Sequence, residues 1–443
     1  MRAASSWPLV LYATIVGPVA GAQTTDVDPQ LGRLIAAVPA IDNHAHPVLP
    51  PPNLVSDRGF DALPVDSMEP ETELAAWRPD SLQLGDAWRA LWHFNEKPPL
   101  GADALKRLGA ARDRVRTQKG EHYDEWVLEQ AGIGVMLANR VSLGPGVQPP
   151  RFRWVPYLDA LVFPLDNSEL AAATPDRAQF FPLEDQLRAQ YLNAVHLQAP
   201  PPTLDQYLAQ VVTATLERHR GEGAVAEKFE IAYLRGFDFA RPTRDEAARI
   251  YGRWIGRAHP DLAEYKILQD FLFRFMAVEC GRLHMAVHLH AMSGAGGYFS
   301  IAGANPLLLE PLVEDPALRG TQFVMLHGGW PFVREAGALL QKPNAWLDVS
   351  QQSLSFPPRT LAGWLREWLE TFPDKVLFAT DGYPFSEPLG WEEATLIASR
   401  NLRQALGIAL TGMLRDREIT RSQAEGIARG VLRENAAKLY GIP

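Results

Sequence analysis

The sequence predicts an α/β fold in which parallel strands alternate with helices, and three observations carry this prediction. Eight short apolar runs of strand length are separated mostly by stretches with helical periodicity. Five of the 11 histidines lie at or near the carboxyl ends of these runs. The glycine-rich turn typical of an open doubly wound sheet does not follow the first run. Eight such units in one chain favour a (β/α)8 barrel over that open sheet.

Composition and length fit this prediction. The chain has 443 residues, of which 47% are hydrophobic and 21% charged, enough for one large domain with insertions or for two domains. The formal net charge of -9 gives no reason to expect binding to nucleic acid or to an anionic membrane. Cys280 is the single cysteine, so an intrachain disulfide and a cysteine-based metal site are both excluded.

The N-terminus has the pattern of a signal peptide. Arg2 is the only charge before Asp26, an apolar core spans 7–19, and Ala20-Gly21-Ala22 forms a small-x-small cleavage site. An uncleaved anchor helix is the alternative, but the apolar core is short for a membrane span and contains two prolines. We therefore expect cleavage after Ala22, secretion or a periplasmic location, and no membrane attachment once residues 1–22 are removed.

The remaining chain, 23–443, is expected to form one barrel. Residues 47–66 are rich in proline and polar side chains and predict a long loop over the first strand end. A helical insertion at about 50–120 then follows, periodic over 72–116, and could form a lid. Residues 166–202 show no clear period and are expected to be irregular.

The expected elements alternate along the chain. The strand candidates are 38–41 with the residues that follow it, 132–138, 152–157, 224–230, 284–290, 323–327, 345–349 and 376–381. The helix candidates are 29–37, 122–130, 204–220, 243–255, 267–282, 307–312, 333–340, 360–371, 392–406 and 421–439.

The ends of these strands carry the residues that suit metal chemistry. His44 and His46 are two apart, so on a strand both imidazoles lie on one face. Active sites of such barrels lie at the carboxyl ends of the strands. The other strand ends supply Lys228 (fourth), His290 with His288 two residues deeper (fifth), His327 (sixth) and Asp381 (eighth).

A hydrolytic site can be built from these residues. His44, His46, His290 and Asp381 can hold one divalent ion and leave a position for water, whose pKa the ion lowers towards ~7. Asp381 can also act as general base, and His327 can polarise a carbonyl or protonate a leaving group. A ligand or supporting role is the alternative for His327.

Two further residues have more than one interpretation. Lys228 could bind a substrate carboxylate, could be carbamylated and bridge two metal ions, or could form a structural ion pair with Glu230. His288 could contact substrate deep in the pocket or support a ligand, and is a weaker ligand candidate than His290.

The motifs at 41–46, 287–290, 304–309, 327–337, 346–350 and 379–382 resemble the amidohydrolase-related family of the amidohydrolase superfamily. The chain is most similar to the branch that also occurs fused to glutamine-synthetase-like domains, and the resemblance covers most of 38–443. It implies a distorted (β/α)8 TIM barrel and a divalent metal, usually zinc or manganese. It also implies ligands at His44, His46, His290 and Asp381, and a catalytic or ligand position at His327.

The same resemblance strengthens the assignment of a functional role to Lys228, because 226–233 is similar to the family's lysine-bearing fourth strand. The chain departs from the family pattern in the extra His288, in the loop 291–297 without an acidic residue, and in the long insertion. The first two departures leave the metal count open, and the third leaves the substrate open.

The expected function is that of an exported metal-dependent hydrolase that cleaves an amide or ester bond of a small molecule, with Zn²⁺ ahead of Mn²⁺ as its metal. Non-oxidative decarboxylation of an aromatic or unsaturated carboxylic acid is the first alternative. A non-catalytic binding barrel is the second, and the complete ligand set argues against it. A small-molecule substrate is the expected partner, and a homo-oligomer is compatible with the sequence.

Overall fold

The computed structural model describes residues 26–49, 57, 60–64, 68–69 and 72–443. The predicted signal peptide, 1–22, and part of the predicted loop after the first strand lie outside these residues. Within the described part of the chain, no helix is both long and apolar enough to span a membrane.

Eight parallel strands form two sheets. The first sheet contains β1 (Ala40–Ala45), β2 (Ile133–Asn139) and β3 (Phe152–Val155). The second contains β4 (Ala226–Phe229), β5 (Ala286–His290), β6 (Phe323–Leu326), β7 (Ala345–Asp348) and β8 (Val376–Leu377), in that order. The number, order and parallel sense of the strands therefore match the prediction.

Short contacts join the two sheets on both sides. Isolated parallel bridges pair Trp154 with Ala224 and Tyr157 with Lys228, between β3 and β4. On the other side, the backbone N–H of Asn43 donates to the Phe378 carbonyl at 2.9 Å. The arrangement is that of a TIM-barrel-like α/β fold.

A closed barrel with one continuous ladder is not formed by the described residues, which corrects the sequence-based expectation. Regular pairing of β8 ends at Leu377, well before the predicted end of the strand. Beyond it, the Asp42 carboxylate accepts hydrogen bonds from the Thr380 amide (2.9 Å) and hydroxyl (2.5 Å). Side-chain hydrogen bonds thus replace part of the backbone ladder between the first and last strands.

The strands enclose a common apolar interior. Each of the eight strands contributes at least one buried side chain to a single cluster, and Ala436 and Ile442 from the C-terminal end of the chain complete it. The strand members are Ile41, Val135, Leu137, Val155, Ala226, Ala286, Val324, Leu326, Trp346 and Leu377. Alternate residues along each strand fill the space between the strands, as in packed barrels.

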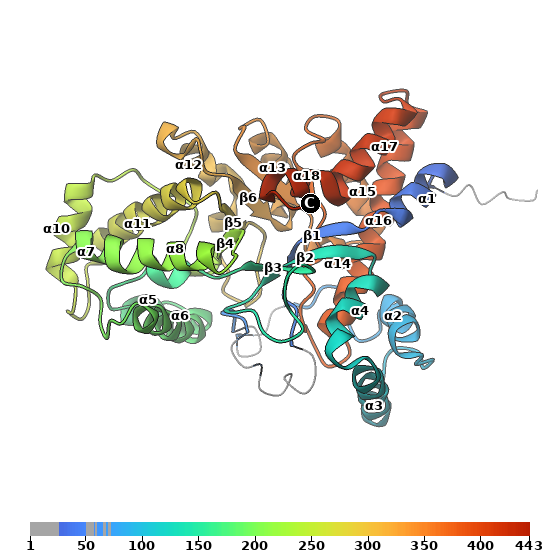
Figure 1. Ribbon diagram of the computed structural model, residues 1–443, viewed down its shortest axis with the longest axis horizontal. Helices are drawn as coiled ribbons and strands as arrows, with labels where there is room; N and C mark the ends of the chain where they lie inside the picture. The colour runs from blue at the N-terminus through green and yellow to red at the C-terminus, as the bar shows by residue number, and fades with distance from the viewer. Residues whose placement is uncertain (1–25, 50–56, 58–59, 65–67, 70–71) are drawn as a thin grey trace, which may run out of the picture.

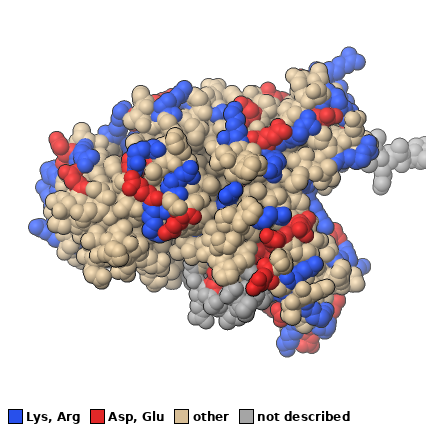
Figure 2. Space-filling view, viewed as in Figure 1, with Lys and Arg blue, Asp and Glu red and all other residues tan. Residues whose placement is uncertain are grey.

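Helices surround the strands, as Figure 1 shows. Those of eight or more residues are α1 (Pro29–Ala37), α2 (Leu82–Trp92), α3 (Ala102–Lys119), α4 (Tyr123–Gln130), α6 (Pro175–Ala194), α8 (Ala214–Gly221), α10 (Arg244–Trp254), α11 (Leu262–Arg282), α15 (Pro358–Leu369), α16 (Trp391–Arg415) and α17 (Arg421–Arg429). The shorter ones are α5 (Ser168–Ala171), α7 (Leu204–Tyr207), α9 (Ile231–Leu234), α12 (Glu310–Val313), α13 (Val333–Leu339), α14 (Gln352–Ser355) and α18 (Asn435–Tyr440). On the face drawn in Figure 2, basic and acidic side chains are interspersed.

The helix α6 corrects the expectation that 166–202 is irregular. Thr174 caps it by accepting a hydrogen bond from the Arg177 amide at 3.2 Å, and Pro175 occupies its first turn. Pro182 lies inside the helix, and the buried face includes Glu184 between apolar positions. The proline and the buried carboxylate together mask the 3.6-residue apolar period in the sequence.

The predicted insertion does contain helices, but the structure fixes them to the barrel. Arg112 of α3 contacts Glu393 of α16 at 2.6 Å, and Arg116 contacts Glu392 at 2.9 Å. The indole of Trp92 on α2 also donates to Glu393 at 2.6 Å. These helices pack against α16 and do not line the central pocket, whereas Leu63, Glu73 and Trp77 of the same insertion do line it. A lid function of the insertion stays a prediction.

Replacement of Glu393 by alanine is expected to destabilise the fold by about 3 kcal/mol, because it leaves the Arg112 guanidinium buried without its carboxylate partner. Urea unfolding measures this loss. Glu129→Ala is the control, since Glu129 is exposed on α4. Equal unfolding midpoints for the two variants would contradict the prediction.

Candidate metal centre

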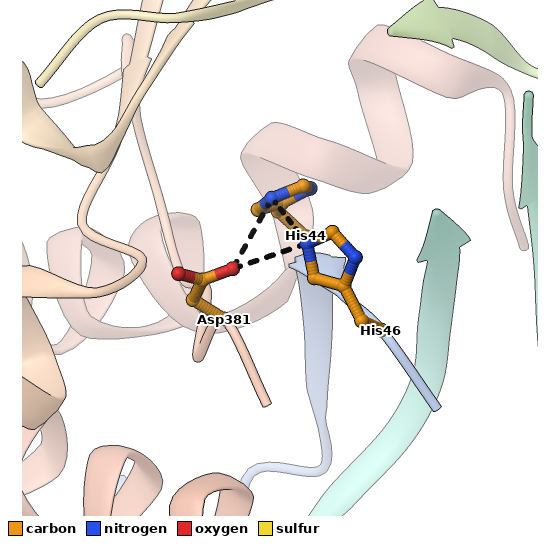
Figure 3. A group of neighbouring side chains, drawn as sticks. All are labelled: His44, His46 and Asp381. Atoms are coloured by element: carbon orange, nitrogen blue, oxygen red, sulfur yellow. Dashed lines mark hydrogen bonds and ion pairs between the residues drawn. The ribbon is translucent and has the colours of Figure 1, made fainter. Parts of the chain in front are cut away.

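Two histidines and one aspartate converge at the carboxyl ends of β1 and β8. The Nε2 atoms of His44 and His46 lie 3.2 Å apart, and the Asp381 Oδ1 atom lies 3.3 Å from the first and 3.4 Å from the second. Figure 3 shows the three side chains pointing toward one another. All three residues are buried, and together they form a group able to hold a metal ion. This confirms that the residues expected at the first and eighth strand ends meet.

The backbone of β1 and of the segment after β8 sets this convergence. The Asp381 amide donates to the His44 carbonyl at 2.8 Å, and the His46 amide donates to the Gly382 carbonyl at 2.8 Å. Asp381 has a φ of 57°, in the left-handed region that non-glycine residues seldom adopt. Two backbone hydrogen bonds thus hold Asp381 in this strained conformation. Backbone strain of this kind is frequent at functional sites, and the Asp381 carboxylate is part of this one.

The outer nitrogen of His46 is held by an acidic side chain. The Asp61 Oδ2 atom lies 2.6 Å from His46 Nδ1, and the Tyr157 hydroxyl lies 3.2 Å from the same nitrogen and donates to Asp61. When His46 is neutral, Nδ1 carries the proton toward this carboxylate and Nε2 presents a lone pair to His44 and Asp381. A carboxylate behind a histidine is the usual support of a metal ligand.

The protonation of the three groups suits a cation. Burial, and then the charge of Lys228, hold the pKa of His44 well below its usual range, so its imidazole is neutral. Burial alone would raise the pKa of Asp381, but the electrostatic interaction with the His327 ring and the hydrogen bonds with His44 and His46 hold it well below its ordinary value. Burial also opposes protonation of His46, yet the Asp61 and Asp381 carboxylates raise its pKa to about 9. Without a metal, a proton therefore bridges the same acceptors that a divalent ion would satisfy.

His290 lies beside this group without belonging to it. Its ring centroid is 4.5 Å from that of His327, and its Nδ1 atom is 3.6 Å from Glu230. Its Nε2 atom is buried and has no hydrogen-bond partner among the described residues. An orphaned buried ring nitrogen at the pocket wall fits the expected role of fourth ligand, which stays a prediction.

Lys228 lines the pocket as an ion-paired residue. Its Nζ atom lies 2.8 Å from Glu230 Oε1 and 3.4 Å from His44 Nε2, and both charged side chains are buried. The Glu230 pair that the sequence suggested is therefore present, and Lys228 also reaches the metal-ligand group. His288 does not line the pocket among the described residues. Its Nε2 atom contacts the Tyr440 hydroxyl of α18 at 2.7 Å.

His327 follows β6 and is oriented by Asp348 of β7 and by Ser350, which lies just after β7. The Ser350 hydroxyl donates to Asp348 Oδ1 at 2.5 Å and lies 2.8 Å from His327 Nδ1. Because the single hydroxyl proton goes to Asp348, the contact to Ser350 requires a proton on His327 Nδ1. Burial holds the pKa of His327 well below its usual range, so the neutral imidazole leaves Nε2 as an acceptor.

The pocket above these residues opens to solvent and encloses about 850 Å³ when the space at its open mouth is included. The metal-ligand group, Lys228, Glu230, His290 and His327 lie at its buried end. Several lining residues were not predicted from the sequence, namely Leu63, Glu73, Trp77, Tyr233, Ala295, Gln351, Tyr383, Phe385, Ser386 and Leu389. Asp61, behind His46, was not predicted either. Most of these residues lie in loops, where no periodic pattern points to them.

Comparisons with known proteins agree with the geometry. A family model described as amidohydrolase matches residues 171–442. Protein fluG of Emericella nidulans is 29% identical over 231 residues, which is 49% of this chain and 26% of fluG. The chain thus spans about a quarter of the length of this curated relative.

Solved structures show the same fold at low identity. A candidate metal-dependent hydrolase from Lactobacillus casei has a TM-score of 0.62 and 15% identity, covering 93% of this chain and 97% of the other. Glucuronate isomerase from Caulobacter crescentus has a TM-score of 0.56 and 13% identity, with 93% of each chain covered. Uronate isomerase from Thermotoga maritima has a TM-score of 0.55 and 11% identity, covering 94% and 98%. At these identities the likeness shows the fold alone.

Proposed function

Because the chain belongs to the amidohydrolase family, a family of metal-dependent enzymes, we propose that it hydrolyses an amide or ester bond of a small molecule. The observation that carries this proposal is the convergence of two imidazole nitrogens and one carboxylate oxygen, 3.2–3.4 Å apart, at the buried end of an open pocket. A divalent ion bound there would supply Lewis-acid activation of water and of the scissile carbonyl.

The residues that would hold the ion are His44, His46 and Asp381, with His290 as the fourth ligand. His44 of β1 and His46, which directly follows β1, both present Nε2, and Asp61 fixes the outer nitrogen of His46. Nitrogen and carboxylate donors of this kind suit Zn²⁺ and also Mn²⁺. We infer zinc first, because imidazole donors dominate the set.

Two groups would manage the protons of the reaction. Of the two Asp381 carboxylate oxygens, Oδ1 faces the nitrogens of His44 and His46, whereas Oδ2 lies 3.9 Å from His327 Nδ1. Oδ2 can therefore accept the proton of the attacking water. His327 needs revision from the sequence-based role. Its neutral Nε2 atom carries no proton, so it can protonate a leaving group only after it has accepted one.

Decarboxylation of an aromatic or unsaturated acid is the second candidate, because it would use the same ligands, with Asp381 or His327 protonating the carbon once it has accepted a proton. The aromatic pocket wall formed by Trp77, Tyr383 and Phe385 favours it only in part, since an apolar group of an amide or ester fits there equally well. The described lining contains no arginine that could hold the carboxylate of such a substrate.

One assay series separates these reactions. The purified protein is stripped with a chelator, reloaded with Zn²⁺ or Mn²⁺, and tested on panels of small amides, esters, aromatic acids and uronates. We expect metal-dependent release of amine or alcohol, without CO2 and without isomerised uronate. Metal-dependent CO2 release would instead establish the decarboxylase. A protein that binds stoichiometric metal and converts no amide or ester of a broad panel would refute the proposed hydrolase.

A further inference from the structure

We propose that the pocket binds a substrate whose end remote from the scissile bond is an organic ammonium group, held by the aromatic wall of Trp77, Tyr383 and Phe385 and by the Glu73 carboxylate. This inference rests on the proposed function, because it names the substrate class of the same site. Three observations support it: the continuous aromatic wall, the negative charge of Glu73, and the ion pair that Lys228 forms with Glu230.

The aromatic wall runs without a break from the metal-ligand group to the rim. The ring of Tyr383 contacts that of His46, with 5.3 Å between centroids, and the ring of Phe385 lies 5.3 Å from Tyr383. Trp77 continues the row at 4.8 Å from Phe385. Exposure rises along this row, since Tyr383 is buried while Phe385 and Trp77 are half-buried. A substrate with its carbonyl at the ligands therefore extends along ring faces and edges toward solvent.

The rim of the pocket is acidic. Glu73 lies four residues before Trp77, lines the pocket and is exposed. None of the ion pairs found among the described residues involves its carboxylate. The acid is thus available to a ligand that reaches the rim.

The described lining offers no matching positive charge for an anionic substrate. Lys228 is its one basic residue apart from histidines, and it lies at the buried end, paired with Glu230 at 2.8 Å. A carboxylate or phosphate at the rim would meet Glu73. The Arg78 guanidinium, which donates to the Glu73 carbonyl oxygen at 3.5 Å, does not belong to the described lining. An ammonium group would be attracted both by the Glu73 carboxylate and by the negative faces of the aromatic rings.

A neutral apolar group is the competing occupant, and Glu73 distinguishes the two. Ring contacts alone would favour neutral and cationic groups of the same shape to a similar degree. A carboxylate at the rim adds attraction for the cation only, and that added attraction depends on ionic strength because Glu73 is exposed.

The experiment uses two isosteric probes, choline and the neutral 3,3-dimethylbutan-1-ol, titrated calorimetrically into the metal-loaded protein. We expect choline to bind about tenfold more tightly, and the preference to fall at high salt. Glu73→Gln should remove most of the preference while leaving the affinity for 3,3-dimethylbutan-1-ol unchanged. Trp77→Leu should weaken choline more than the neutral probe.

Glu129→Gln is the matched control, because it removes one exposed carboxylate that does not line the pocket. Metal content and the thermal midpoint of each variant establish that it is folded. Equal affinity of the wild-type protein for both probes would overturn the inference, and so would a choline preference that survives Glu73→Gln.

Failure of this inference and failure of the proposed function are separable, because the binding measurement requires no turnover. A protein that hydrolyses amides or esters without preferring choline would refute the substrate class alone. A choline preference in a protein that hydrolyses nothing would support the ligand class and refute the hydrolase. If hydrolysis is found, acetylcholine should exceed 3,3-dimethylbutyl acetate in kcat/KM, and Glu73→Gln should narrow that ratio mainly through KM.

Discussion

Replacement of Asp381 by asparagine is expected to lower metal-dependent kcat by about 10³-fold, the typical contribution of a positioned general base. The substitution keeps the size of the side chain but removes its charge and its ability to accept a proton. Asp381 Oδ1 lies within 3.4 Å of the Nε2 atoms of His44 and His46, so metal affinity should fall as well. Turnover measured at saturating metal separates the loss of the base from the loss of the ligand.

Asp80→Asn provides the control, since Asp80 is exposed and does not line the pocket. Its kcat and metal content should equal those of the wild-type protein. If Asp381→Asn retained full kcat once reloaded with metal, Asp381 would not be the base. If it also bound metal as tightly as the wild type, the His44, His46 and Asp381 group would not be the metal centre.

The residues that could be predicted from the sequence are those tied to strand periodicity. His44 lies on β1 and His46 directly follows the strand, two residues further on, and Asp381 follows the apolar run that contains β8. In a parallel sheet these ends meet at one edge, so local pattern was enough to bring the three together. The same rule placed His290 and His327 at the pocket wall.

Pattern could not predict how deep each side chain lies or what it contacts. His288 shares a strand face with His290, yet it contacts Tyr440, which lies 152 residues away in sequence. Tyr440 in turn donates to Asn43, which donates to Asp348 at 2.7 Å. This chain of contacts, which continues to Ser350 and His327, depends on the packing of α18 against the strands and has no local signature.

The limits of the fold prediction have similar causes. Pro182 and the buried Glu184 interrupt the apolar period of α6, so the helix was not predicted, although the Thr174 cap and Pro175 are helix-start signals. The (β/α)8 barrel was expected from the number of strands, from the missing glycine-rich turn and from the family resemblance. The replacement of backbone pairing by the Asp42–Thr380 hydrogen bonds depends on the spatial approach of β1 and β8, which eight apolar runs do not specify.

Replacement of Asp61 by asparagine should weaken metal binding by about 10- to 100-fold. No pattern in the sequence pointed to this residue. Its carboxylate lies 2.6 Å from His46 Nδ1 and raises the pKa of that imidazole. Without the charge, the His46 ring loses both its fixed orientation and the polarisation that makes Nε2 a strong donor. Competition with a chelator of known affinity, at fixed pH, measures the loss.

Tyr157→Phe is the matched comparison, because it removes a neutral hydroxyl that contacts the same nitrogen at 3.2 Å and leaves the Asp61 carboxylate in place. We expect this variant to bind metal several-fold more tightly than Asp61→Asn. The pKa of His46 in the metal-free protein, followed by NMR, should fall in Asp61→Asn and change less in Tyr157→Phe. Wild-type metal affinity in Asp61→Asn would show that the orientation of His46 comes from the backbone of β1 alone, and that the acidic side chain in the loop serves the fold and not the metal.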